Sequence, residues 1–214
     1  MYDLILFDLD GTLTLPEEGI TKSVKYALEA YGIIENSQEN LRRFIGPPLV
    51  DGFMEFYGMT REDALGAVAK YRERFSVVGL FENELIDGVV DMLKTLKANN
   101  KKLALATSKP SPFVKKIIEK FEIDAYFDAV SCAEFDGTRN DKAEVIAYAL
   151  EQIGDYKNAV MVGDRKHDVI GARKNRIDCI GVSFGYAEDG ELKENHATLI
   201  VDDINELTNV LLKN

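Results

Sequence analysis

The stretch Leu4-Ile5-Leu6-Phe7-Asp8-Leu9-Asp10-Gly11-Thr12-Leu13 decides the fold, because it sets two carboxylates directly after an apolar run. A strand sends alternate side chains to the same side, so we expect Asp8 and Asp10 to point the same way. Two such anions repel each other unless a cation or a proton lies between them. Gly11 then lets the chain turn where a residue with a Cβ would be strained. The arrangement suits a hard divalent cation and an anionic substrate, whereas the alternative for an Asp-x-Asp-Gly segment is a plain surface turn.

From about residue 84 onward, short apolar runs of strand type alternate with amphipathic segments of helical spacing. We expect strands at residues 101–107, 129–131, 159–162, 179–182 and 198–201, and helices at residues 85–97, 113–121, 141–153, 169–174 and 206–212. Repeated strand–helix–strand units with nearly continuous apolar strands indicate a parallel sheet with helices on both faces. The predicted fold is therefore an α/β, Rossmann-like core, in which ligands bind at the carboxyl ends of the strands.

Residues 15–80 differ, because they show helical patterns and no strand of comparable quality. Within them, Thr60 and Asp63 resemble a capping box ahead of a helix. We expect this segment to be an α-helical cap domain inserted into a core made of residues 1–14 and 81–214. An insertion just after the first strand is expected above the strand ends, where it could cover a pocket.

Polar groups also lie near the ends of later predicted elements. Thr107 and Ser108 end a strand, where a hydroxyl and backbone N–H groups can bind phosphate oxygens; the alternative is the N-cap of the next helix. Lys142 opens a helix, where it is either a solvated surface lysine or a cation that reaches the site. Asp164 and Asp168 follow another strand and could complete an oxygen-rich site for Mg²⁺, which favours six oxygen ligands.

Composition limits the class of protein and of partner. The chain has 214 residues, of which 46% are hydrophobic and 29% are charged, as in an ordinary soluble globular protein. A net charge of −11 disfavours binding of nucleic acid through a basic face, although a local cation can still admit a small phosphorylated metabolite. The short apolar runs predict no membrane span and no signal peptide. Cys132 and Cys179 are expected to be reduced, buried thiols of a cytoplasmic protein, with a disulfide as the unsupported alternative.

Taken together, these segments resemble the motifs of the haloacid dehalogenase superfamily, and the resemblance spans nearly the whole chain. The resemblance rests on Phe7 to Leu13, Thr107-Ser108, Lys142, and Gly163-Asp164 through Asp168. Smaller details, such as Ala106-Thr107-Ser108-Lys109-Pro110 and Phe44 to Leu49, are similar to the bacterial phosphoglycolate phosphatase-like branch. Some members of that branch are described as 5′-nucleotidases. The branch has an α-helical cap between the first and second motifs, where this chain has its helical segment.

The resemblance implies a Mg²⁺-dependent phosphatase that hydrolyses a small phosphate monoester through an aspartyl-phosphate. Asp8 would be the nucleophile that attacks phosphorus. Asp10 would protonate the leaving alkoxide and then deprotonate the water that hydrolyses the intermediate. These roles agree with the physics of phosphoryl transfer, which depends mostly on positioning and on neutralisation of charge.

The other implied roles are metal ligation and phosphate binding. Mg²⁺ would be held by the Asp8 carboxylate, the Asp10 main-chain carbonyl and Asp164, with Asp168 supporting or ligating through water. The transferring phosphoryl oxygens would be bound by Thr107, the Ser108 amide and Lys142. In the cap, the candidates for contact with substrate are Lys22, Arg42 and Arg43, and the alternative for each is a solvated surface charge.

Several alternatives stay open within and outside the family. Asp10 argues against dehalogenases, which lack an acid at that place, and against phosphonatases, which have alanine there. A sugar phosphomutase shares Asp8 and Asp10, and a 5′-nucleotidase shares the whole chemistry. From another class, a catalytically silent phosphate-binding protein on the same fold would usually have lost a carboxylate or the lysine. The sequence leaves open the substrate and whether the chain is a monomer or a homodimer.

Overall fold

The chain forms two compact units in the computed structural model, which describes residues 1–213. One unit combines Met1–Thr14 with the chain from Leu85 onward, and the other is Leu15–Glu84. The predicted second boundary, at residues 80/81, lies a few residues earlier. The connecting strands β2 (Thr14–Leu15) and β3 (Glu84–Leu85) pair in a two-stranded sheet, which is not among the strands expected from the sequence.

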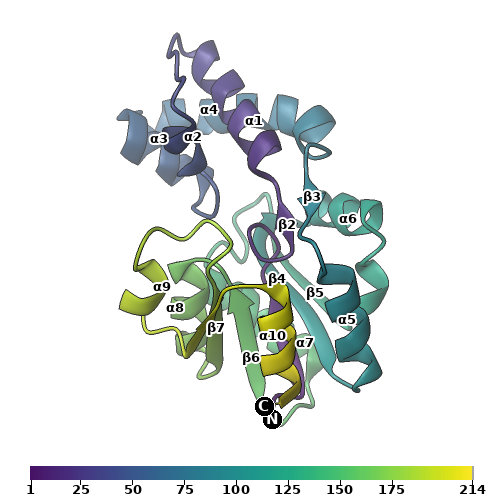
Figure 1. Ribbon diagram of the computed structural model, residues 1–214. Helices are drawn as coiled ribbons and strands as arrows, with labels where there is room; N and C mark the ends of the chain where they lie inside the picture. Colours follow the sequence, from purple (N-terminus) through teal and green to yellow (C-terminus); the bar gives the residue numbers. More distant parts are fainter. Residues whose placement is uncertain (214) are drawn as a thin grey trace. The chain divides into compact units, whose positions relative to one another are not determined.

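The first unit contains a six-stranded sheet in the order β5-β4-β1-β6-β7-β8 (Figure 1). All neighbouring strands in it are parallel. Its strands are β1 (Leu4–Phe7), β4 (Lys102–Pro110), β5 (Ala129–Ala133), β6 (Ala159–Gly163), β7 (Asp178–Val182) and β8 (Leu199–Val201). Every residue of β1 is buried, as expected of a central strand covered on both faces. The predicted α/β, Rossmann-like class is confirmed.

Helices cover the sheet on its two faces (Figure 1). On one face, α7 (Lys142–Ile153) and α8 (Lys166–Lys174) share an apolar core with Leu4 and Leu6. On the other, α5 (Val89–Ala98) packs against α10 (Ile204–Lys213). The remaining helices of this unit are α6 (Ser111–Lys120), the 3₁₀ turn η2 (Asp124–Tyr126) and α9 (Glu191–Glu194).

The register of the sheet determines which residues meet at its carboxyl edge. Phe7, the last residue of β1, pairs with Leu105 on one side and with Val162 on the other. The residues just beyond these three positions therefore lie at the same edge of the sheet, where β4 continues to Pro110. They include Asp8, Thr107 and Asp164.

The second unit is helical, apart from its ends in β2 and β3. It contains α1 (Glu17–Ala30), α2 (Gln38–Arg42), α3 (Leu49–Tyr57), α4 (Arg61–Arg74) and a π-helical turn, η1 (Phe75–Gly79). Thr60 caps α4, because its hydroxyl accepts the N–H of Asp63 at 3.1 Å, as the sequence predicted. The start of α1 lies so close to η1 that a Cβ on Gly19 would be 2.0 Å from the carbonyl oxygen of Gly79. Glycine is therefore required at this contact.

Cys132 and Cys179 are both buried, as expected, and neither is bonded to the other. Within residues 1–213, no helix has the length and apolar character needed to cross a bilayer.

Candidate active site

The site begins where β1 ends. The Asp8 N–H donates to the carbonyl of Val162 at 2.9 Å, so the pairing with β6 continues one residue beyond the strand and holds Asp8 at the sheet edge. The chain then turns back, since the N–H groups of Leu13 and Thr14 both donate to the carbonyl of Leu9. Gly11 has φ +84°, the left-handed conformation that glycine adopts without strain. The expected turn after the two carboxylates is therefore present.

Asp164 lies against this turn and is fully buried. Its carboxylate accepts the backbone N–H of Tyr186 at 2.7 Å and faces the Thr12 hydroxyl at 3.4 Å. Added Cβ atoms on Gly11 and Gly185 would lie 2.2 and 2.3 Å from atoms of its side chain. Two glycines thus make the room that Asp164 occupies, and its carboxylate is held in one place.

Lys142 joins two of the buried carboxylates. Its Nζ lies 2.6 Å from Asp8 Oδ1 and 2.8 Å from Asp168 Oδ1. Asp141 caps α7 by accepting the N–H of Ala143, so the helix begins at Lys142 and directs this residue into the site. The side chain is buried rather than solvated, which decides between the two alternatives for Lys142. Burial lowers its pKa, but the charges of Asp168 and Asp8 outweigh burial and raise the pKa above its ordinary value.

The carboxylates of Asp8, Asp164 and Asp168 lie within 4.8 Å of one another, and all three are buried. If all are ionised, Lys142 leaves two negative charges unbalanced. Burial and the charges of Asp168 and Asp8 raise the pKa of Asp164 well above its usual range. Burial also raises the pKa of Asp168 to about 6, although Lys142 opposes this shift. The cluster therefore needs either protons or a cation.

These residues fit a divalent metal ion. The donors are carboxylate oxygens, which suit Mg²⁺, and the charge that Lys142 leaves unbalanced matches a divalent ion. Glycine at positions 11, 163 and 185 keeps side chains away from the cluster, since a Cβ on Gly163 would lie 2.2 Å from Asp168 Cγ. The Asp10 carboxylate does not belong to this group. Ligation of a divalent ion by the Asp10 main-chain carbonyl stays a prediction.

Asp10 contacts a different lysine. Its Oδ2 forms a close ion pair with Lys109 Nζ, and its Oδ1 faces the Thr14 hydroxyl at 3.4 Å. The Lys109 side chain is only 7% exposed, so this pair is largely shielded from water. Lys109 is not among the site residues expected from the sequence. The signal available was its place directly after Thr107-Ser108 at a strand end.

Thr107 and Ser108 lie at the end of β4, beside β1. The pairing of β4 with β5 is irregular between Thr107 and Pro110, a feature common next to active sites. The Thr107 hydroxyl accepts the Lys109 N–H at 3.3 Å. Thr107 is not the N-cap of the following helix, because Pro110 has that position. Phosphate binding by Thr107 and Ser108 stays a prediction.

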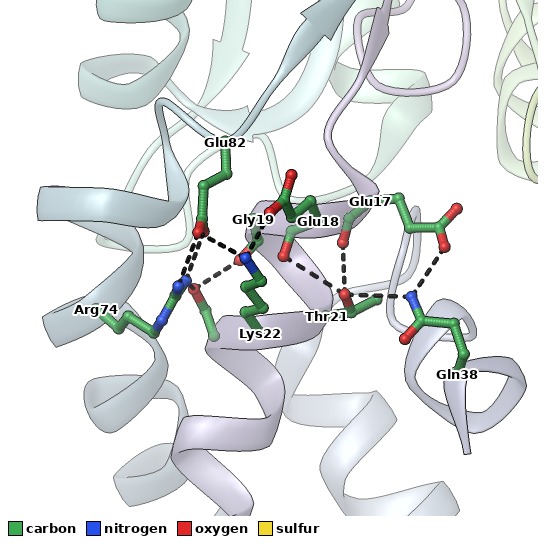
Figure 2. A network of polar contacts seen from close by, with 9 residues as sticks. Glu17, Glu18, Gly19, Thr21, Lys22, Gln38, Arg74 and Glu82 are labelled. Carbon is green, nitrogen blue, oxygen red and sulfur yellow. Dashed lines mark hydrogen bonds and ion pairs between the residues drawn. The ribbon is translucent and has the colours of Figure 1, made fainter. Parts of the chain in front are cut away.

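The three basic candidates of the cap all have partners inside the cap. Figure 2 shows Lys22 between Glu18 and Glu82, and its distance to Glu82 is 3.2 Å. Arg42 Nε lies 2.7 Å from Glu17 Oε1, and the Arg43 guanidinium lies 3.9 Å from the centre of the Phe56 ring. These contacts give each residue a structural role. Contact of Lys22, Arg42 and Arg43 with substrate stays a prediction.

Tyr186 contacts the site but lies outside the sequence motifs described above. It contributes a backbone N–H, and every residue type except proline has one, so its identity carries no sequence signal. The only signal in the sequence near this contact is Gly185, where a side chain would collide with Asp164.

The sequence profile of haloacid dehalogenase-like hydrolases matches residues 5–182. A 5′-nucleotidase of Pseudomonas aeruginosa is 44% identical over 211 residues, which cover 98% of this chain and 96% of the relative. The tyrosine-protein kinase PtkA of Mycobacterium tuberculosis is 34% identical over 213 residues, covering 97% of this chain and 72% of that protein. The crystal structure of a predicted phosphatase from Clostridium acetobutylicum is 44% identical with a TM-score of 0.95 and covers both chains fully. The acidic site at the end of β1 and these similarities agree, and the chain belongs to the haloacid dehalogenase-like hydrolases as a phosphatase that acts on phosphoric monoesters.

Proposed function

We propose that this protein is a Mg²⁺-dependent phosphatase that hydrolyses a small, soluble phosphate monoester through an aspartyl-phosphate on Asp8. The observation that carries the proposal is the convergence of Asp8, Asp164 and Asp168, from distant parts of the chain, within 4.8 Å beside Lys142. A carboxylate can approach an anionic phosphate only where positive charge offsets the repulsion between them. Lys142 supplies part of that charge.

In the first step, an Asp8 carboxylate oxygen forms a bond to phosphorus while the bond to the ester oxygen breaks. Asp10 gives its proton to the leaving alkoxide. In the second step, water attacks the aspartyl-phosphate, Asp10 takes the proton from that water, and the bond between phosphorus and Asp8 breaks. Inorganic phosphate leaves, and both carboxylates return to their starting forms. One difficult displacement is thereby divided into two easier ones.

The residues that would hold Mg²⁺ are Asp8, Asp164 and the Asp10 carbonyl, with Asp168 in support. When bound, the ion would neutralise charge on the transferring phosphoryl group. Lys142 holds Asp8 and Asp168 in place, and the Tyr186 N–H fixes Asp164, so the ligand oxygens are arranged by the protein itself. Thr107 and the Ser108 amide would bind the phosphoryl oxygens from the adjacent strand end.

The substrate class that the comparisons favour is a nucleoside 5′-monophosphate, because the 44% identical relative is named a 5′-nucleotidase and is covered almost completely. Phosphoglycolate belongs in the same panel, because the motif details around Lys109 and Phe44 to Leu49 resemble that branch. A sugar phosphate tests the mutase alternative. ATP with a tyrosine peptide tests the activity for which PtkA is named.

The deciding experiment measures phosphate release from this panel, with Mg²⁺ and with chelator, for the wild type and Asp8→Asn. We expect wild-type turnover of at least one monoester, its loss with chelator, and a loss of more than about 1,000-fold in Asp8→Asn. Asp91→Asn is the matched control, because the Asp91 side chain is 89% exposed on α5. Near-native activity in Asp8→Asn would refute the nucleophile assignment. A mutase would instead require a bisphosphate activator and release little phosphate.

A further inference from the structure

Glu191 is a buried carboxylate that the proposed chemistry does not use. It opens α9 and is 7% exposed. Its Oε1 accepts the Arg165 Nε–H at 3.0 Å and the backbone N–H of Lys166 at 2.6 Å. Its Oε2 accepts an Arg165 Nη2–H at 3.3 Å and the backbone N–H of Glu188 at 3.2 Å. One side chain thus fixes two separate loops through four hydrogen bonds.

Each of these loops donates a backbone N–H to a carboxylate of the metal cluster. In the loop after β6, the Arg165 N–H donates to Asp168 Oδ2 at 3.0 Å. In the loop after β7, the Tyr186 N–H donates to Asp164 Oδ2 at 2.7 Å. Glu191 bonds to Arg165 itself in the first loop, and to Glu188, two residues from Tyr186, in the second. Glu191 therefore acts on the carboxylate cluster indirectly, through the two loops that carry the Arg165 and Tyr186 N–H donors.

The two carboxylates pack against glycines in or next to the same loops: Gly163 ends β6, and Gly185 lies in the loop after β7. A Cβ on Gly163 would lie 2.2 Å from Asp168 Cγ, and one on Gly185 would lie 2.3 Å from Asp164 Cβ. The glycine backbone therefore packs directly against each carboxylate, in a space that no side chain could share. A displacement of either loop is expected to move a ligand oxygen.

We propose that Glu191 is a positioning residue for the divalent-metal site, which sets the spacing of Asp164 and Asp168 by tying together the loops that hold them. The inference rests on the proposed Mg²⁺ site. Partners of metal ligands typically contribute about 10- to 100-fold to metal affinity, and Glu191 acts one bond further out through a charged pair. A buried guanidinium that loses the charge of a two-pronged partner is expected to reorganise its loop, since removing one member of a buried ion pair is costly.

The test is the Mg²⁺ dissociation constant of the whole protein without substrate, measured by isothermal titration calorimetry. Glu191→Gln keeps the shape of the side chain and removes its charge, and we expect it to weaken Mg²⁺ binding about 10- to 100-fold. Glu82→Gln is the matched control, because Glu82 forms a comparable two-pronged pair with Arg74 at 2.8 and 3.0 Å, within the cap (Figure 2). It should lower thermal stability and leave Mg²⁺ affinity unchanged.

Three outcomes decide the inference. Weaker Mg²⁺ binding in Glu191→Gln but not in Glu82→Gln supports it. Unchanged Mg²⁺ affinity in a folded Glu191→Gln overturns it while the proposed metal requirement stands, whereas a wild type that binds no Mg²⁺ overturns both. If Glu191→Gln does not fold, Glu191→Asp decides, because it keeps the charge but is too short to keep all four bonds; unchanged affinity there also overturns the proposal.

Discussion

The two carboxylates of the first strand end are distinguished by their lysines. Asp8 pairs with Lys142, which also holds Asp168, so it belongs to the charge cluster that would bind metal. Asp10 pairs with Lys109, outside that cluster. A nucleophile must stay ionised and fixed, whereas an acid–base group must exchange a proton with the leaving group and water. The separate partners keep Asp10 out of the charge cluster around Asp8, although only Leu9 lies between the two carboxylates along the chain.

Lys109 should matter for turnover through Asp10. In Lys109→Met the ammonium that holds Asp10 is lost, and we expect kcat to fall by up to about 100-fold, more with an alkyl than with an aryl phosphate. An alkoxide is the poorer leaving group, so it depends more on the proton from Asp10. Steady-state kinetics on both ester types, with KM and kcat separated, measures the effect.

A double-mutant cycle shows whether Lys109 acts through Asp10. Adding Lys109→Met to Asp10→Asn should then cost little further activity, since the shared interaction is already lost. Fully additive losses would mean that Lys109 acts independently, for example by binding substrate. Lys115→Met is the control for loss of one lysine, because its side chain is 76% exposed on α6.

At the level of elements, Asp3 fastens β1 to the turn that leads into β6. Its carboxylate accepts the N–H of Asn158 at 2.7 Å and that of Lys157 at 2.9 Å. Burial raises the pKa of Asp3, but these backbone N–H donors outweigh burial and lower the pKa below its usual value. Because β1 carries Asp8 and β6 leads to Asp164, the clamp lies at the opposite ends of the two strands that support the site.

Asp3→Asn should reduce the free energy of unfolding at pH 7 by about 1 kcal/mol, because a charged acceptor becomes neutral on a half-exposed side chain. The folded-state pKa is lowered, so this stabilisation exists above the unfolded pKa of about 3.9 and is lost as pH falls through the folded pKa. Urea unfolding of wild type and variant at neutral and acidic pH measures both values. An equal difference at the two pH values would contradict an electrostatic origin. Asp91→Asn, which removes an exposed charge from the first turn of α5, should show a smaller difference.

The order of elements was predictable from sequence, whereas several ends were not. Strand β6 begins at Ala159 as predicted, because its run of apolar residues is unambiguous. Helix α8 begins at Lys166 and not at the expected Val169, because Lys166-His167-Asp168 are polar and do not extend the helical pattern of apolar residues. Its start is fixed by the Asp168 carboxylate, which accepts the Arg165 N–H. The π-helical turn η1 and the short α9 were missed for a similar reason: they are set by tertiary contacts and not by a repeating pattern.

The site was predictable where side-chain type and strand order carry the information. Parallel strand ends share one edge, so Asp8 and Asp164 were expected at that edge, and the pairing of β1 with β6 makes them neighbours there. Sequence could not show that Lys109 selects Asp10, since that pairing depends on the irregular end of β4. Nor could it show Tyr186 or Glu191, because one acts through its backbone and the other through a loop without periodicity.

For the whole molecule, the site couples segments that folding alone brings together. Asp8 comes from the N-terminal strand, Lys142 from α7, and Asp164 and Asp168 from the turn between β6 and α8. An ion bound by these carboxylates would bind the folded chain and not the unfolded one, so binding adds to stability. The net charge of −11 repels anionic substrates at long range, so their attraction depends on the local positive charges of the site, which are Lys142 and the cation that the three carboxylates would hold.

The charge balance of the cluster predicts opposite effects of Asp164→Asn with and without metal. Without metal, wild type crowds three buried carboxylates around Lys142, so Asp164→Asn should melt at the same temperature or higher, because it removes one like charge. With Mg²⁺ at about 100 times its dissociation constant, wild type should gain about 2.7 kcal/mol, while the variant gains little. Thermal melts of both proteins, with chelator and with Mg²⁺, measure the four values. A strong destabilisation of Asp164→Asn in chelator would mean that the Asp164 carboxylate serves mainly as a structural hydrogen-bond acceptor for Tyr186 and Thr12. It would also contradict the idea that repulsion among the three carboxylates destabilises the metal-free protein. If Mg²⁺ raised both melting temperatures equally, the ion would bind elsewhere.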